Sequence, residues 1–89
     1  MNLDSKLTVP PQVLSRLVED ETVLLNLETG IYFGLDGVGQ KIWEAVTAGQ
    51  DLGTTVEKVV SEYDVDKAQA EADVIEFANT LVERGLLLE

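Results

Sequence analysis

The pattern of apolar and polar residues in the first half of the chain is typical of strands. Residues 22–27 and 31–35 are rich in β-branched, aromatic and aliphatic side chains. Residues 28–30, Glu-Thr-Gly, separate the two stretches, and Gly30 can take the positive φ that a tight turn requires. The pattern therefore predicts a β-hairpin with a two-residue turn at Thr29 and Gly30.

Two apolar segments precede this hairpin. Residues 7–9 predict a short β-type segment that is closed by Pro10 and Pro11, and residues 13–18 predict a further extended piece. The three acidic side chains of residues 19–21 predict a solvated turn.

Helical spacing replaces alternation after the hairpin. Asp36 is a candidate N-cap, the apolar positions within residues 38–46 recur at helical spacing, and Gly49 is a candidate stop. A second helix is expected from a capping box formed by Thr54 and Glu57, ahead of a further apolar stripe.

The third predicted helix is the longest. Asp66 and Gln69 repeat the capping arrangement, and the helix is expected to end near Gly85. Residues 86–88, three leucines, add a short strand or cover the sheet. The apolar stripe of this helix consists of Ala70, Val74, Phe77, Ala78 and Leu81.

This order of elements predicts the fold class. A chain of 89 residues is long enough for one core, and its 45% hydrophobic and 26% charged residues are typical of a globular protein. We expect one domain over residues 1–89, with an α+β, winged-helix-like fold in which an N-terminal three-stranded antiparallel sheet is followed by three helices.

The predicted hairpin has two apolar faces. One face carries Leu25, Leu27 and Tyr32, and the other carries Leu24, Phe33 and Leu35. A small domain usually covers only one face of such a sheet with its own helices. Either an extended peptide pairs with the outer strand, or the helices and the final leucines cover both faces, and periodicity does not decide between the two.

Composition excludes several functions. The chain has no Cys and no His, which removes disulfides, thiolate and imidazole chemistry and ordinary zinc sites. Its formal charge of −11 disfavours nucleic acid and anionic membranes as partners. The amino terminus lacks a signal-peptide pattern and no apolar run approaches the ~20 residues of a membrane span, so we expect a cytoplasmic protein. No cofactor and no metal ion are predicted.

Two carboxylates, Asp73 and Glu76, flank the stripe of the third predicted helix. They form either a clamp for a basic or hydroxyl group of a ligand or part of an ordinary solvated face. No nucleophile, base or phosphate-binding loop accompanies them in sequence, so they do not read as a catalytic pair, and no enzyme activity is expected.

Residues 23–44 resemble the PqqD-like family of precursor-peptide recognition elements, and the likeness continues in residues 72–77 and 81–86. The Gly-Val-Gly turn of residues 37–39 and the Ile-Trp-Glu of residues 42–44 favour the branch found as a stand-alone protein in lasso-peptide biosynthesis.

The resemblance implies a groove between the third strand and the third helix that binds the leader segment of a ribosomally made precursor peptide. It also implies that the module does no chemistry and hands the leader to a partner, which in lasso systems is a leader-removing cysteine protease. The implied peptide-binding residues are Ile31, Tyr32, Phe33, Gly34, Leu35, Asp73, Glu76, Phe77, Thr80 and Leu81.

Two other classes of function stay open at this point. A winged-helix transcription regulator would need a cationic face, which six scattered basic residues do not readily supply. A module that uses its apolar face for dimerisation needs no leader peptide at all. An enzyme would have to work with carboxylates and tyrosines alone.

Overall fold

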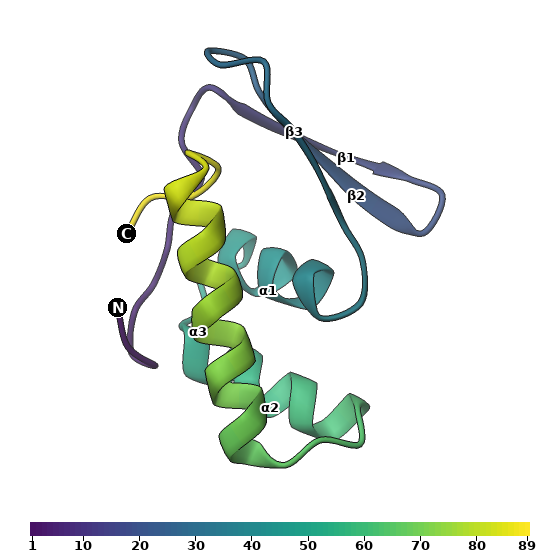
Figure 1. Cartoon of the computed structure of the whole chain (residues 1–89), viewed down its shortest axis with the longest axis vertical. Helices are drawn as coiled ribbons and strands as arrows, with labels where there is room; N and C mark the ends of the chain where they lie inside the picture. The colour runs from purple at the N-terminus through teal and green to yellow at the C-terminus, as the bar shows by residue number, and fades with distance from the viewer.

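The computed structural model describes residues 1–89. In chain order, a three-stranded sheet comes before three helices (Figure 1). The α+β fold class and the predicted order of elements are confirmed. The elements are β1 (Val13–Val18), β2 (Glu21–Asn26), β3 (Tyr32–Leu35), α1 (Gly37–Thr47), α2 (Leu52–Glu62) and α3 (Lys67–Glu83).

The first hairpin joins β1 to β2 in antiparallel register, from Val13 opposite Asn26 to Val18 opposite Glu21. The predicted turn at residues 19–21 is one residue too long, because Glu21 already pairs within the sheet. Glu19 has a φ of 57°, and this left-handed conformation makes the turn tight enough for Glu21 to pair with Val18. The Glu21 carboxylate stays exposed while its main chain is paired.

The second hairpin, from β2 to β3, is confirmed, but the predicted two-residue turn at Thr29 and Gly30 is wrong. Tyr32 lies opposite Leu25, and the Asn26 N–H donates to the Ile31 carbonyl at 3.0 Å, so the loop consists of residues 27–30. The register differs from the expected one by two residues. Since side chains alternate with a period of two, this shift leaves the predicted faces of the strands unchanged.

Asn26 explains the longer loop. Its side-chain carbonyl accepts the N–H groups of Glu28 at 2.9 Å and Thr29 at 3.2 Å, which is an Asx-type turn. Its amide donates to the Gly85 carbonyl at 3.0 Å, just beyond the end of α3. Asn26 is only 2% exposed, so these bonds satisfy an otherwise costly buried amide and join the hairpin to the carboxyl end of the last helix.

Helix α1 lies where it was predicted, between the N-cap Asp36 and Gly49, whose φ is 76°. Residues 37–39, expected as a turn, are instead its first helical turn. Helix α2 begins earlier than expected, and the predicted capping box of Thr54 and Glu57 is wrong. Asp51 is the N-cap and accepts both the N–H and the hydroxyl of Thr54 at 2.8 Å.

Helix α3 begins as predicted, with Asp66 accepting the N–H of Gln69 at 2.8 Å. A capping box also requires a hydrogen bond from the Gln69 side chain back to the N-cap residue. This bond is absent, because the Gln69 side chain donates to Asp73 at 2.8 Å. The helix ends at Glu83, before Gly85 with a φ of 72°. Its buried positions include four of the five predicted stripe residues, and Phe77 is half-buried at the edge of the stripe.

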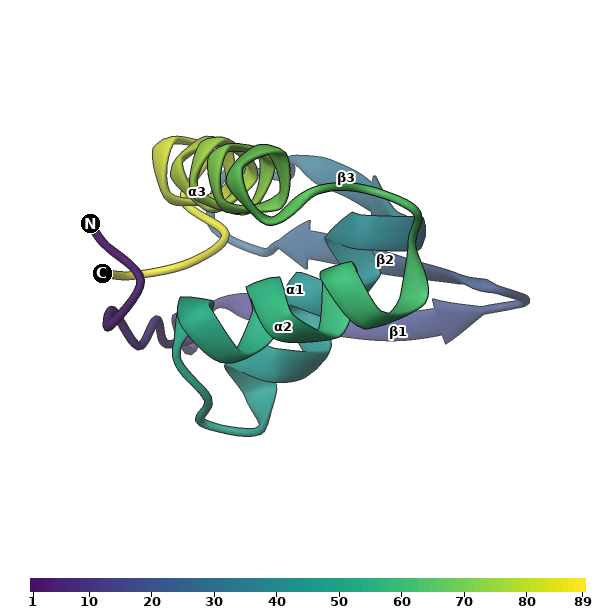
Figure 2. The ribbon, with the colours of Figure 1, turned by 90° about the horizontal axis from the view of Figure 1, so that it is seen from below.

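The helices pack against one face of the sheet, and the β1–β2 hairpin projects beyond them (Figure 2). The core joins inward side chains of β2 and β3 to all three helices and to the final leucines. Leu86 and Leu87 are buried within this core. Residues 7–9 do not form the expected strand, since only Thr8 pairs, in a single bridge with Leu88. The fully buried large side chains include Leu24, Leu35, Ile42, Leu52, Leu81 and Leu86.

Candidate functional site

β3 is an edge strand of the sheet, whose order is β1-β2-β3. Its ladder with β2 begins at the bond from the Asn26 N–H to the Ile31 carbonyl. Because hydrogen-bonded pairs alternate along an antiparallel ladder, the main-chain groups of Phe33 and Leu35 point toward β2. Those of Tyr32 and Gly34 point out of the sheet, where no strand pairs with them. The outer edge of β3 thus offers an alternating row of donors and acceptors.

An aromatic contact connects β3 to α3. The rings of Phe33 and Phe77 meet edge to face, with centroids 6.2 Å apart and an interplanar angle of 80°. Gly39 of α1 makes room for this contact, because a Cβ there would lie 2.8 Å from Cζ of Phe77 and 3.4 Å from a methyl group of Leu35. The floor between the strand and the helix is therefore apolar and closely packed.

A hollow of about 330 Å³ opens beside this floor. It brings together four residues that the sequence singled out, and it adds one, Val38, from α1. The lining residues are Val38, Asp73, Glu76, Phe77 and Thr80. Asp73 and Glu76 are exposed, whereas Phe77 and Thr80 are half-buried. We call the outer edge of β3 together with this hollow the β3–α3 groove.

The remaining predicted site residues have different environments. Tyr32 is 70% exposed, on the face of the sheet that the helices leave open, and Ile31 is 38% exposed. Leu35 and Leu81 are almost completely buried, so their side chains support the groove from below. The Thr80 hydroxyl donates to the Glu76 carbonyl at 3.1 Å within the helix.

Arg84 follows the carboxyl end of α3. This residue was not among the site residues predicted from the sequence. Its guanidinium carbon is 5.2 Å from the centroid of the Phe33 ring, a cation–π distance. The sequence does show a basic residue at the end of the helix, one residue before Gly85. It does not show that Phe33, which is distant in sequence, is the aromatic partner of this residue.

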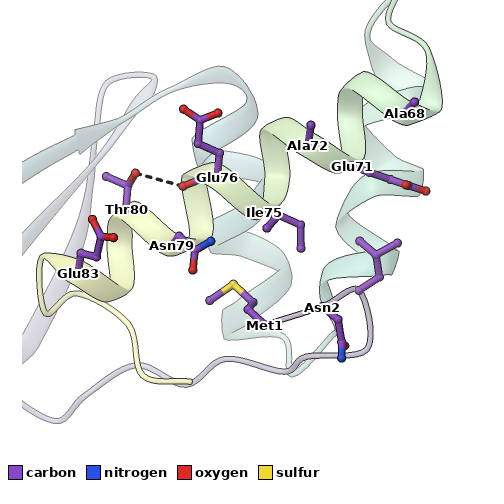
Figure 3. Close-up of a pocket in the computed structure, with 11 residues that line it drawn as sticks. Met1, Asn2, Ala68, Glu71, Ala72, Ile75, Glu76, Asn79, Thr80 and Glu83 are labelled. Atoms are coloured by element: carbon purple, nitrogen blue, oxygen red, sulfur yellow. Dashed lines mark hydrogen bonds between the residues drawn. The ribbon is translucent and has the colours of Figure 1, made fainter.

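The largest hollow of the molecule lies on the far side of α3. It measures about 820 Å³ and is formed with the amino-terminal residues. In Figure 3, Ile75 points from α3 toward the segment that carries Met1 and Asn2. Glu76 and Thr80 border both this hollow and the smaller one beside Phe77. The two hollows on either side of α3 therefore meet at Glu76 and Thr80.

The open face of the sheet is apolar. Leu14, at 53% exposure, and Val18, at 50%, lie there with Tyr32, around a hollow of about 360 Å³. No group of three or more His, Cys, Asp or Glu side chains is placed to hold a metal ion. None of the three helices combines the length and the hydropathy that a membrane span requires.

Taken together, the fold and the site define a small α+β module with an open edge strand beside a helix and an apolar floor between the two. The chain belongs to the PqqD family, described as coenzyme PQQ synthesis protein D, which it matches over residues 21–87. The resemblance inferred from the sequence is therefore confirmed.

Two solved structures are similar to the chain. One is TbiB1 in complex with the TbiA(beta) leader peptide, with 39% sequence identity and a TM-score of 0.84 over 90% of this chain and 93% of that one. The other is a lasso peptide synthetase B1 complexed with the leader peptide, with a TM-score of 0.89 over 96% of this chain and 100% of that one. Its 24% identity supports the fold alone. No curated protein matches the chain.

Proposed function

We propose that this chain binds the leader segment of a ribosomally synthesised precursor peptide, that of a lasso peptide, as an additional strand on β3. The observation that carries the proposal is the outward row of unpaired main-chain groups at Tyr32 and Gly34, on a strand whose Phe33 ring contacts Phe77, which lines the hollow. A paired peptide would gain main-chain hydrogen bonds from the strand, and it would bury alternate side chains against α3.

Membership of the PqqD family and the likeness to TbiB1, which was solved with the TbiA(beta) leader peptide, both support this proposal. The same likeness argues against a dimerisation module or a transcription regulator. The proposed contacts are the main chain of residues 31–35 and the α3 side chains of Asp73, Glu76, Phe77 and Thr80, with Leu81 beneath them.

The module itself takes no part in bond cleavage under this proposal. It acts as one domain in the cytoplasm, and it presents the bound leader to a maturation enzyme, which we expect to be a leader-removing cysteine protease. The absence of His and Cys supports a binding role, because the chain lacks the thiolate nucleophile and the imidazole base of a cysteine protease. The precursor peptide and the protease are thus the two expected partners.

Titration of the isotope-labelled protein with leader peptides tests the proposal. The probes are the TbiA(beta) leader and the leader encoded by any precursor gene adjacent to the gene for this chain, and scrambled versions serve as controls. We expect saturable changes in the backbone amide shifts of residues 31–35 and of α3 from Asp73 to Leu81. The proposal is wrong if no leader peptide binds, or if the shifts map to the open face around Leu14 and leave β3 unchanged.

The role of presenter requires a separate experiment with a protease encoded in the same gene cluster. Cleavage of the precursor by that protease should be faster when the module is present, and a module that cannot bind the leader should give no acceleration. Equal cleavage with and without the module would reject the delivery role and leave leader binding intact.

A further inference from the structure

The two ends of the β3–α3 groove carry opposite charge. The carboxyl end of β3 is acidic, because Asp36 follows the strand and the Glu21 side chain from β2 covers Gly34 on the face of the sheet that also carries Tyr32. Asp73 and Glu76 of α3 line the hollow at the same end. None of these four carboxylates has a basic partner within ion-pair distance.

The amino-terminal end of β3 has a cation instead. Arg84 stacks on Phe33, and the hydrogen bond from Asn26 to Gly85 holds the end of α3 beside the start of β3. The stacked face of a guanidinium leaves its N–H edge free, and five donors on that edge suit a carboxylate. No side chain forms an ion pair with Arg84.

Five other basic side chains leave this contrast intact. Lys6 precedes the sheet, and Lys58 of α2 donates to Gln50 at 3.0 Å. Lys41 lies 3.1 Å from Glu62, and Lys67 lies 3.6 Å from Glu57. Arg16 is on β1, separated from β3 by the central strand. Two carboxylates are near the Arg84 end in sequence: Glu28 lies in the hairpin loop before Ile31, and Glu83 precedes Arg84 and lines the hollow on the far side of α3. Arg84 is the only basic side chain that stacks on a residue of β3.

The direction of a peptide strand added to β3 determines which end of the peptide lies beside the carboxylates and which end lies beside Arg84. The sheet is antiparallel throughout, and antiparallel pairing is the commoner arrangement and the more stable one per residue. A peptide that pairs antiparallel with β3 has its amino-terminal residues beside Leu35 and the carboxylates. Its carboxyl-terminal residues lie beside Ile31 and Arg84.

We propose that the groove selects peptides of polarised charge, with a basic side chain at the amino-terminal end of the paired segment and an acidic side chain at its carboxyl-terminal end. This inference rests on the proposed function. Asp73 and Arg84 are separated by about 16 Å along the helix axis, which an extended peptide spans with about five residues. The two peptide charges should therefore be about five residues apart.

The test uses the leader peptide that saturates in the titration above, in two versions of identical composition. One version has Lys before the paired segment and Asp after it, and the other has the two residues exchanged. Exposed ion pairs are individually weak, so we expect the first version to bind about tenfold more tightly at low salt. The ratio should fall toward one in concentrated NaCl, because exposed charges are screened.

Charge reversal in the protein identifies the residues responsible. Arg84→Glu should reverse the preference at the carboxyl-terminal position, so that the peptide with Lys there now binds better. Arg16→Glu makes the same change in net charge on β1 and should leave the preference unchanged. On α3, Glu76→Lys should weaken binding of a Lys-first peptide, and Glu71→Lys, at the hollow on the far side of the helix, is its matched control.

The outcomes separate the two proposals. If neither version binds, the proposed function itself fails. If both bind equally at low salt, or if the exchanged version binds better, leader binding stands and the polarity inference is overturned. If Arg84→Glu weakens every peptide by the same factor, Arg84 acts through its packing on Phe33, and its proposed role as a charge-reading residue is rejected.

Discussion

Replacing Tyr32 by proline gives the most selective test of strand addition. The Tyr32 N–H points away from β2, so proline at this position removes a donor that the fold itself does not use. Proline is tolerated on the free side of an edge strand, and the Tyr32 side chain is 70% exposed. We therefore expect the free energy of unfolding to change by less than about 1 kcal/mol.

Peptide binding should change far more. The variant loses one main-chain hydrogen bond, worth about 0.5–1.5 kcal/mol, and the proline ring leaves the opposing peptide carbonyl without a partner, which costs about 1–3 kcal/mol more. Together the two losses come to about 1.5–4.5 kcal/mol, which corresponds to a Kd that is at least about tenfold higher. Fluorescence anisotropy of a labelled leader peptide measures this change. Urea unfolding, followed by the emission of the buried Trp43, measures stability.

Two comparisons isolate the cause. Tyr32→Ala keeps the N–H and removes only a side chain on the open face, so it should bind the leader nearly as well as the wild type. Phe33→Pro removes a donor that pairs with Leu24 and breaks the contact with Phe77, so it should destabilise the fold itself by about 3 kcal/mol. Wild-type affinity in Tyr32→Pro, or an equal loss in Tyr32→Ala, would refute strand addition at this edge.

Three further predictions concern the scaffold of the groove. Asn26→Leu should lower the free energy of unfolding by about 2–4 kcal/mol in urea titrations, because three hydrogen bonds of a buried amide are lost, whereas Asn79→Leu at an exposed helical position should have little effect. Gly39→Ala should weaken leader binding and cost about 1–3 kcal/mol of stability in the same assays, since the new Cβ displaces the Phe77 ring; unchanged affinity would show that ring placement does not matter. Hydrogen bonds from the first turn of α2 lower the pKa of Asp51, so its contribution to stability is present above its usual pKa of 3.8 and is lost as the pH falls through the lowered value. The melting temperature of Asp51→Ala should therefore be below that of the wild type at neutral pH, and the difference should shrink in acid.

The parts of the fold that could be predicted depend on periodicity. The faces of β2 and β3 were predicted correctly even though the hairpin loop was not, because a register error of two residues preserves alternation. The loop itself depends on Asn26, whose side chain bonds to Glu28 and Thr29 within the loop and to Gly85, 59 residues away. Nothing local in the sequence reveals that distant partner.

The start of α2 shows a different limit. Asp51 and Thr54 both carry the chemistry of an N-cap, and local preference alone does not choose between them. The choice follows from burial, because a start after Asp51 brings Leu52 onto the helix, where it is 1% exposed in the core. Which of two competent caps is used is therefore decided by packing, and packing is a property of the whole fold.

The groove could be predicted only in part for the same reason. The alternation of apolar residues predicted β3 as a strand with two apolar faces. It could not show that Gly39 leaves space for the Phe77 ring or that Arg84 stacks on Phe33. These contacts join α1, α3 and β3. They exist only after the helices have covered one face of the sheet.

Both edges of this sheet are open, and the difference between them explains why only one is a credible peptide site. β1 offers unpaired main-chain groups of the same kind as β3, but no residue of β1 contacts α3 as Phe33 does, and the hollow that β1 lines is on the open face of the sheet. Main-chain pairing is available to almost any extended peptide, so it supplies affinity without discrimination. Under the proposed function, the same pairing at β3 would place peptide side chains against the Phe77 floor and between charges of opposite sign. In this proposal, selectivity therefore comes from α3 and its neighbours, while the strand provides the means of attachment.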